Sequence, residues 1–108
     1  MFITTTDFIP GYIIAEVIDI ARGSTVKARH IGKDIGAMFK TMVGGEIEAY
    51  TNLMVGAREE AILRMEADAE RMGANAVINV RFTTSAIMQG ASEILAYGTA
   101  VRIEQINV

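Results

Sequence analysis

The chain has 108 residues, of which 51% are hydrophobic and 6% aromatic, so we expect one domain over residues 1–108 with a core of Ile, Val, Met and Ala. Its net charge of −3 argues against a nucleic-acid surface, and the absence of cysteine excludes disulfides, thiolate metal sites and a cysteine nucleophile. No apolar run reaches the ~18 residues of a membrane span and no secretory signal is visible, so we expect a soluble, cytoplasmic protein with neither membrane nor nucleic acid as a partner.

Two strands joined by a turn are predicted at the start of the chain. Residues 1–6 suit a short edge strand. The sequence IPGY at residues 9–12 predicts a type II turn, because proline pre-sets φ at the second position and glycine accepts a positive φ at the third. Residues 12–20 are rich in β-branched side chains and apolar on both faces, which predicts a central strand or one covered by a neighbour. We expect the sequence RGS at residues 22–24 to end this strand.

Two helices are predicted in the middle of the chain. Residues 27–42 carry apolar side chains at helical spacing, although Gly32 and Gly36 inside this segment each cost about 1 kcal/mol relative to alanine. The second helix follows the glycine pair at residues 44–45. It is expected to end at Gly73, because glycine readily adopts the left-handed conformation that commonly terminates a helix.

The second helix is the longer one, and it is defined by an apolar stripe with a spacing of three or four residues. The stripe consists of Ile47, Tyr50, Met54, Ala57, Ala61, Met65, Ala69 and Met72. Charged residues fall mostly elsewhere, and Glu60 and Arg64 are placed to form an ion pair four residues apart. At about 1.5 Å per residue the helix would be roughly 40 Å long, so we expect part of its apolar face to meet another subunit.

Residues 76–83 and 93–106 predict two further strands, joined by a hairpin turn at residues 89–92. Small side chains on one face of the last strand, such as Ala96 and Gly98, would let the long helix pack closely against the sheet. The predicted fold class is therefore α+β, with a mainly antiparallel sheet, two helices packed on it, a long second helix and the element order β-β-α-α-β-β.

Few sequence patterns of catalysis are present. Gly32 and Lys33 resemble part of a phosphate-binding loop, but Lys27 holds the position of the first required glycine. The serines have no nucleophile-elbow context, and one histidine would have to serve any hydrolytic triad. An enzyme is therefore less well supported than a structural or binding protein.

Four short motifs together resemble the YbjQ-like family of small bacterial and archaeal proteins. They are GGEIEAY at residues 44–50, AREEA at residues 57–61, GANAV at residues 73–77 and AYGTAV at residues 96–101. The resemblance runs essentially from end to end of the chain. It implies an α+β subunit that assembles into a ring-shaped homopentamer, and it carries a heavy-metal-binding label without an established biochemical role.

A candidate anion site follows from the arginines. Arg58 lies in the AREEA motif close to the packing stripe, and together with Arg81 it would bind a phosphate or carboxylate in a bidentate manner. The alternative is a structural ion pair with Glu46 or Glu93. The full set of candidate ligand-binding residues is Arg58, Arg81, Glu46, Tyr50 and Asn75. A pocket between subunits that is lined by Arg58, Tyr50 and Asn75 would favour an enzyme.

The heavy-metal label has little support in the residues themselves. Soft metals prefer thiolate, thioether and imidazole ligands, and the chain has no cysteine and one histidine. His30 and Asp34 lie four residues apart, as do Met38 and Met42. Methionines at this spacing usually pack in cores, and a His–Asp pair at this spacing is commonly a surface hydrogen bond. We therefore predict no metal site and no cofactor.

The function that the sequence favours is a non-enzymatic, ring-forming protein with a structural role or a role in binding a small anionic ligand. Its partner is expected to be itself, as a homopentamer, with the number five taken from the family resemblance. Two alternatives stay open. One is heavy-metal binding, as the label implies, and the other is an enzyme whose active site forms between subunits.

Overall fold

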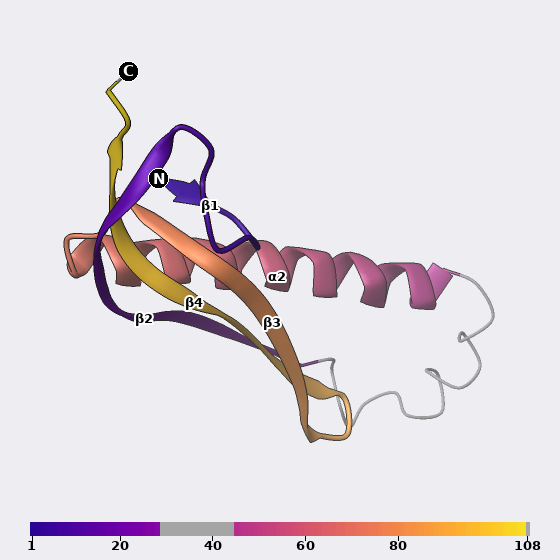
Figure 1. Cartoon of the computed structure of the whole chain (residues 1–108). Helices are drawn as coiled ribbons and strands as arrows, with labels where there is room; N and C mark the ends of the chain where they lie inside the picture. The colour runs from indigo at the N-terminus through magenta and orange to yellow at the C-terminus, as the bar shows by residue number, and fades with distance from the viewer. Residues whose placement is uncertain (29–44, 108) are drawn as a thin grey trace.

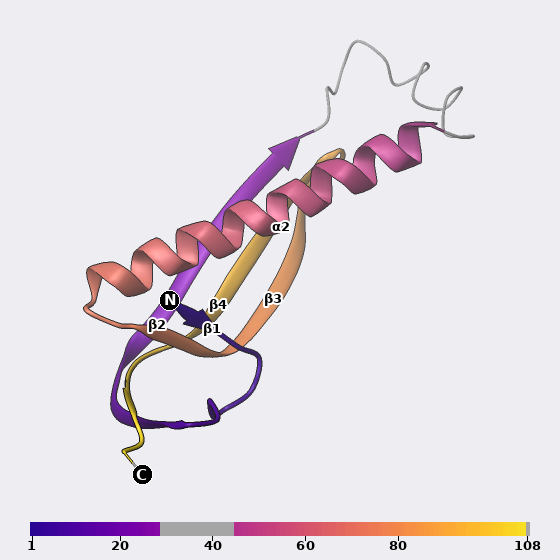
Figure 2. The ribbon, with the colours of Figure 1, turned by 90° about the horizontal axis from the view of Figure 1, so that it is seen from above.

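The computed structural model describes residues 1–28 and 45–107 of the chain (Figure 1). Its elements in chain order are β1 (Phe2–Ile3), β2 (Tyr12–Ala28), α2 (Gly45–Arg71), β3 (Ala76–Met88) and β4 (Ala91–Gln105). The strands form a sheet, and the long helix α2 extends along one face of it (Figure 2). The molecule is elongated, with extents of 63 × 22 × 15 Å.

The sheet is mixed, with the strand order β1-β3-β4-β2. Strand β4 pairs antiparallel with β2 on one side and with β3 on the other. The short strand β1 pairs parallel with β3, with Phe2 opposite Ala76. Helix α2 packs mainly against β2, the strand at one edge of the sheet. One edge strand therefore lies beneath the helix, while most of β3 does not.

The predicted arrangement of two helices on a mainly antiparallel sheet is wrong in the described part of the chain, which holds one helix and a mixed sheet. The first helix was predicted over residues 27–42. Lys27 and Ala28 instead belong to β2, and residues 29–42 lie outside the described residues. Hydrogen bonding to β4 holds the end of β2 in the sheet, with Lys27 opposite Ser92.

The apolar stripe of α2 is confirmed where its side chains are described. Ala57, Ala61, Met65 and Ala69 are fully buried, and they form a core with small residues of β2 and β4 such as Ala96. Met54 and Met72 are partly buried at the two ends of this stripe, whereas the side chains of Ile47 and Tyr50 lie outside the description. Because so many of the core side chains are alanine, the helix backbone lies close to the sheet.

Gly23 marks the closest approach of α2 to β2. A Cβ atom at this position would lie 2.7 Å from the carbonyl carbon of Arg64, and nearer still to Met65 N and Ala61 O. The sequence predicted that residues 22–24 end the strand, and this prediction is wrong because β2 continues to Ala28. The glycine is required by the helix that packs on the strand and not by a turn.

Gly98 also lies in a tight contact, but its neighbours belong to β3. A Cβ atom at Gly98 would lie 2.7 Å from Val77 Cγ1 and 2.8 Å from Ile78 O. The register between β3 and β4 shifts just beyond this point, where Asn79 has a positive φ of 54°. The small residue therefore accommodates an irregularity of the neighbouring strand, and the predicted contact of Gly98 with the helix is replaced by a contact within the sheet.

The predicted turn at residues 9–12 and the helix end at Gly73 are confirmed, whereas the hairpin turn predicted at residues 89–92 is shorter, because β4 begins at Ala91. Gly11 has a φ of 84°, and the N–H of Tyr12 donates a hydrogen bond to the carbonyl of Ile9 at 3.1 Å, as the turn at residues 9–12 requires. Gly73, also at 84°, follows the last residue of α2. A second small core lies beside the first turn, where Ile9 and Tyr12 pack on a cluster that consists of Ala76, Ile78, Val101 and Ile103.

Candidate functional site

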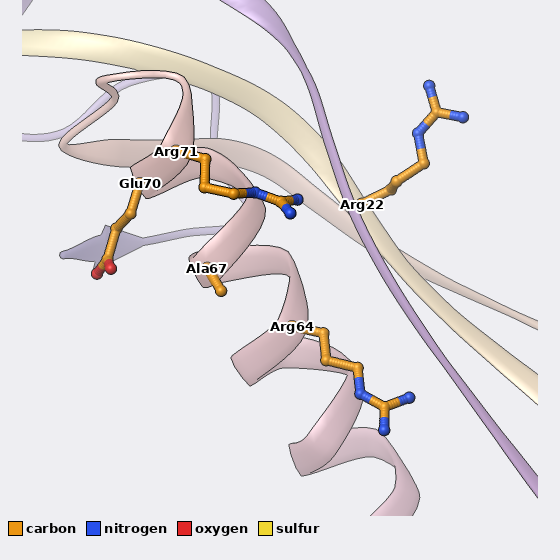
Figure 3. Close-up of a pocket in the computed structure, with 5 residues that line it drawn as sticks. All are labelled: Arg22, Arg64, Ala67, Glu70 and Arg71. Carbon is orange, nitrogen blue, oxygen red and sulfur yellow. The ribbon is translucent and has the colours of Figure 1, made fainter.

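An open hollow lined by charged residues lies where the end of α2 meets β2 (Figure 3). Its volume is about 620 Å³, and the residues that line it are Arg22, Arg64, Ala67, Glu70 and Arg71. Arg64 and Arg71 are seven residues apart, so they share one side of the helix, and the small Ala67 lies between them. In Figure 3 both side chains extend toward β2, Glu70 points to the other side of the helix, and Arg22 extends away from the helix.

Asp68 links the last turns of α2 to the backbone of β2. Its Oδ2 accepts a hydrogen bond from the N–H of Arg22 at 3.0 Å, and its Oδ1 pairs with the guanidinium group of Arg71. The hydrogen bond from the Arg22 N–H, followed by that from Arg71, lowers the pKa of this carboxyl group below its usual value. Asp68 is therefore an ionised acceptor at neutral pH and not a proton donor.

Glu60 makes a similar link about two turns earlier in the helix. Its carboxylate lies 2.9 Å from Lys27 Nζ at the end of β2 and 2.7 Å from Arg64 Nη2. The hydrogen bond from Lys27 is the main cause that lowers the pKa of Glu60, with the charge of Arg64 adding to it. Arg64 also donates from Nη1 to the carbonyl of Ser24 at 2.6 Å. The predicted Glu60–Arg64 pair is thus confirmed and extended to β2.

Arg22 is the arginine of the hollow that keeps its binding capacity. Among the described residues, its guanidinium group has no hydrogen-bonding partner, whereas those of Arg64 and Arg71 are already paired with Glu60 and Asp68. The Arg22 group extends away from the helix, so it does not converge with the guanidinium groups of Arg64 and Arg71. On its own, a guanidinium group can bind phosphate or carboxylate in a bidentate manner. The paired carboxyl groups of Glu60 and Asp68 are poor general acids, because their pKa values are lowered.

The two arginines of the predicted anion site, Arg58 and Arg81, lie in different environments. Arg58 is exposed on α2 and has no hydrogen-bonding partner among the described residues. Arg81, on β3, donates from Nη1 to the carbonyls of Thr5 at 2.9 Å and Val80 at 2.8 Å. Neither arginine pairs with Glu93 in the described structure. Their role in anion binding stays a prediction, while Arg81 has a clear structural role in holding the N-terminal segment against β3.

Asn75 lies between the end of the helix and the last strand. Its Nδ2 donates to the carbonyl of Ile103 at 3.0 Å, and its Oδ1 accepts from the N–H of the same residue at 2.7 Å. Both ends of the side-chain amide are therefore used within the fold. Glu46 and Tyr50 belong to the first turns of α2, and their side chains lie outside the description.

Sequence reasoning missed the residues that line the hollow. Arg64 was predicted only as the partner of Glu60, Arg22 only as part of the end of a strand, and Arg71 was not predicted as a site residue. A sequence signal for the helix side of the hollow does exist, because Arg64, Ala67 and Arg71 are spaced by three and four residues. No local signal places Arg22 beside them, since that contact depends on how α2 lies on β2.

Metal ligands do not gather in the described part of the chain. Within residues 1–28 and 45–107, no three His, Cys, Asp or Glu side chains form a group that could hold a metal ion. The candidates His30, Asp34, Met38 and Met42 lie outside these ranges. Met65, on the helix, is fully buried and packs in the core as predicted. Within the same ranges, no helix is long and apolar enough to cross a membrane.

Comparison with known proteins identifies the family. The family model described as "Putative heavy-metal-binding" matches residues 1–104. The chain is 56% identical over 107 residues to a UPF0145 protein of Thermosipho africanus, with 99% of both chains covered. It is 52% identical to a UPF0145 protein of Thermotoga petrophila, which covers 98% of this chain and 100% of the relative.

The fold is similar to a crystal structure from Pediococcus pentosaceus, a protein of unknown function in the DUF74 family. The TM-score is 0.66 at 19% identity, with 96% of this chain and 98% of that chain covered, so the similarity concerns the fold alone. The family assignment rests on the match over residues 1–104 and on relatives that are more than half identical. The chain therefore belongs to the YbjQ-like family of UPF0145 proteins, as the four sequence motifs predicted.

Proposed function

We propose that the chain is a non-enzymatic structural subunit that assembles with copies of itself. The observation that supports this proposal most directly is the amount of apolar surface that the chain leaves uncovered. Val17 is 65% exposed, Ile13 is 53% exposed and Ile20 is 52% exposed, all on strand β2. Large apolar side chains that are exposed to this extent are a liability when they gather on the surface of a soluble monomer, and contact with another subunit removes them from water.

The shape of the chain supports the same proposal. Its radius of gyration is 18.0 Å, whereas a compact domain of this length has roughly 13 Å. The face of the sheet that is turned away from α2 carries a shallow apolar hollow lined by Ile20, Arg22, Leu95 and Tyr97. An elongated chain with two thin cores buries little apolar surface for its length, and association adds the missing burial.

Light scattering coupled to size exclusion tests this proposal. The family resemblance gives five copies as the expected number, and five chains of 11.7 kDa would weigh about 58.5 kDa. A mass of 11.7 kDa at micromolar concentration would overturn the proposal of self-assembly. A homogeneous assembly of another size would leave self-assembly in place and overturn the number five. The protein should be purified without tags, because a tag adds its own contacts.

A second candidate function is the binding of a small anion by Arg22. The supporting observation is its guanidinium group, which has no partner among the described residues and extends away from the helix. Calorimetric titration with inorganic phosphate should then detect binding that weakens about tenfold or more in Arg22→Ala. Arg102→Ala is the matched control, because Arg102 is exposed and pairs with Glu16 on another part of the sheet. Absence of binding at about 10 mM phosphate would exclude this candidate.

A further inference from the structure

The outer edge of β2 is closed by side chains over its central residues. The N–H of Ile20 donates to Asp19 Oδ1 at 2.7 Å, and the N–H of Arg22 donates to Asp68 Oδ2 at 3.0 Å. Further along, the carbonyl of Ser24 accepts a hydrogen bond from Arg64 at 2.6 Å. These bonds occupy backbone groups that would otherwise be free to pair with another strand.

The outer edge of β3 is covered at its start and free at its end. The N–H groups of Asn79 and Val80 donate to the carbonyls of Thr6 and Thr4, both at 3.0 Å, so the N-terminal segment closes this part of the edge. From Phe82 to Met88, β3 pairs with β4 on one side and with no described strand on the other. Figure 1 shows the hairpin end of β3, at the bottom of the view, with β4 on one side and no labelled strand on the other, and in Figure 2 this end is the upper one.

The free edge also lacks the usual protection in its sequence. Residues 82–88 read FTTSAIM, with no charge, no proline and no glycine. Met88 is 61% exposed, and Phe82 and Ile87 are also exposed. Natural sheets protect an open edge with lysine, proline, a bulge or a covering element, because an uncharged β-prone edge pairs with other chains. Side chains close the edge of β2, whereas β3 has a register shift between Ala86 and Met88 and neither charge nor proline from Phe82 to Ala86, so the two edges have different roles.

We propose that the edge of β3 over residues 82–88 pairs with a strand of a second copy of this chain and continues the sheet across the subunit boundary. This inference rests on the proposed function, self-assembly, and names the surface that makes the contact. A strand is the fitting occupant because only another strand satisfies a row of alternating N–H and C=O groups. A second copy is the fitting source because Ile13 and Val17 leave apolar surface exposed on β2, at the opposite side of the sheet.

The test is a double substitution on the free edge, Thr83→Lys with Ser85→Lys. Both side chains are exposed and lie on the face turned away from α2, so the folded subunit should tolerate them. Lysines on an edge strand oppose the addition of another strand. The expected result is that light scattering falls to the 11.7 kDa of one chain, with the circular dichroism spectrum retained. The control is Asn52→Lys with Gln105→Lys, which adds the same charge at exposed positions outside the edge and should keep the assembly.

The outcomes separate the two proposals. A wild-type monomer would overturn self-assembly itself. A wild-type assembly whose mass is unchanged by the edge lysines would overturn the edge contact and leave self-assembly in place. Hydrogen exchange of the wild-type assembly covers the case in which the variant does not fold. Every amide from Phe82 to Met88 should be protected, and fast exchange at alternate positions would show that the outer edge is open to water and overturn the inference.

Discussion

Asp68 on α2 accepts a hydrogen bond from the backbone N–H of Arg22 on β2, with 3.0 Å between Oδ2 and N. A helix side chain therefore closes part of the edge of the sheet. The same carboxylate pairs with Arg71, one turn further along the helix. Asp68 therefore fixes the end of the helix and occupies a backbone group on the strand edge. Because Arg22 and Arg71 both line the arginine hollow, its negative charge also lies beside their positive charges.

Asp68→Asn should change how stability depends on pH. Folding lowers the pKa of Asp68, so the unfolded chain binds this proton more readily than the folded chain. The ionised carboxylate therefore stabilises the fold fully above about pH 4, and this stabilisation is lost as the pH falls through the pKa of the folded state. Asparagine keeps an acceptor for the Arg22 N–H but has no charge. Urea unfolding at a series of pH values should find the variant less stable at pH 7 and equal to the wild type at the acid end. A constant difference at every pH would contradict this account.

Gly23→Ala should destabilise the chain strongly. The new Cβ would collide with backbone atoms of α2 and not with the end of a flexible side chain, so the helix itself must move. Overpacking of this kind costs about 1–3 kcal/mol or more, which denaturant unfolding resolves easily.

The matched control is Gly56→Ala, at an exposed helix position where a Cβ meets nothing within 4 Å. This change should stabilise the helix by up to about 1 kcal/mol. If Gly23→Ala and Gly56→Ala change the free energy of unfolding alike, α2 and β2 do not approach each other at Gly23 as closely as in this structure.

The elements that sequence reasoning predicted well are those set by local rules. The helix stripe from Ala57 to Ala69 follows from a period of three and four residues, and the turn at residues 9–12 follows from the conformations of proline and glycine. The end of β2 could not be predicted in this way. Gly23 has the appearance of a turn residue, and its real cause is a helix distant in the sequence. The parallel pairing of β1 with β3 has no local signal either.

The candidate site was predictable to a smaller extent. The Glu60–Arg64 pair lies within one helix and was predicted, but the contacts of this pair with Lys27 and Ser24 depend on the packing of α2 on β2. Asn75 was predicted as a ligand residue in a pocket between subunits. Its hydrogen bonds to Ile103 join two segments that no sequence spacing relates.

Asn75→Ala tests the structural role of this residue. The substitution removes two hydrogen bonds to the backbone of Ile103, which is itself buried, and should cost about 1–3 kcal/mol of unfolding free energy. Asn107→Ala is the control, because Asn107 is exposed near the end of the chain and should change stability by less than about 0.5 kcal/mol. An Asn75 variant as stable as the wild type would return this residue to the list of candidate ligand contacts.

The metal label leads to a separate prediction. With one histidine and no cysteine in the chain, we expect no tight site for a soft metal. Elemental analysis after dialysis should find less than one metal ion per chain, and titrations with copper(I), zinc and cadmium should detect no submicromolar binding. A stoichiometric site that is lost in His30→Ala would contradict this prediction and support the label.

Gly98→Val should destabilise the chain by roughly 2–4 kcal/mol, and the structure changes the reason for this expectation. The sequence suggested a collision with the helix, whereas a side chain at Gly98 would meet Val77 and the backbone carbonyl of Ile78 on β3. The two explanations can be separated by a second substitution. Smaller residues on α2 would relieve a collision with the helix, whereas a smaller residue at position 77 would relieve a collision with β3.

The decisive measurement is a double-mutant cycle by denaturant unfolding. Val77→Ala should recover part of the stability lost in Gly98→Val, since Val77 Cγ1 lies 2.7 Å from the new Cβ position. Recovery should be incomplete, because the carbonyl of Ile78 cannot be removed by a side-chain substitution and lies almost as near, at 2.8 Å. Additive effects of the two changes would mean that Gly98 and Val77 do not compete for the same space.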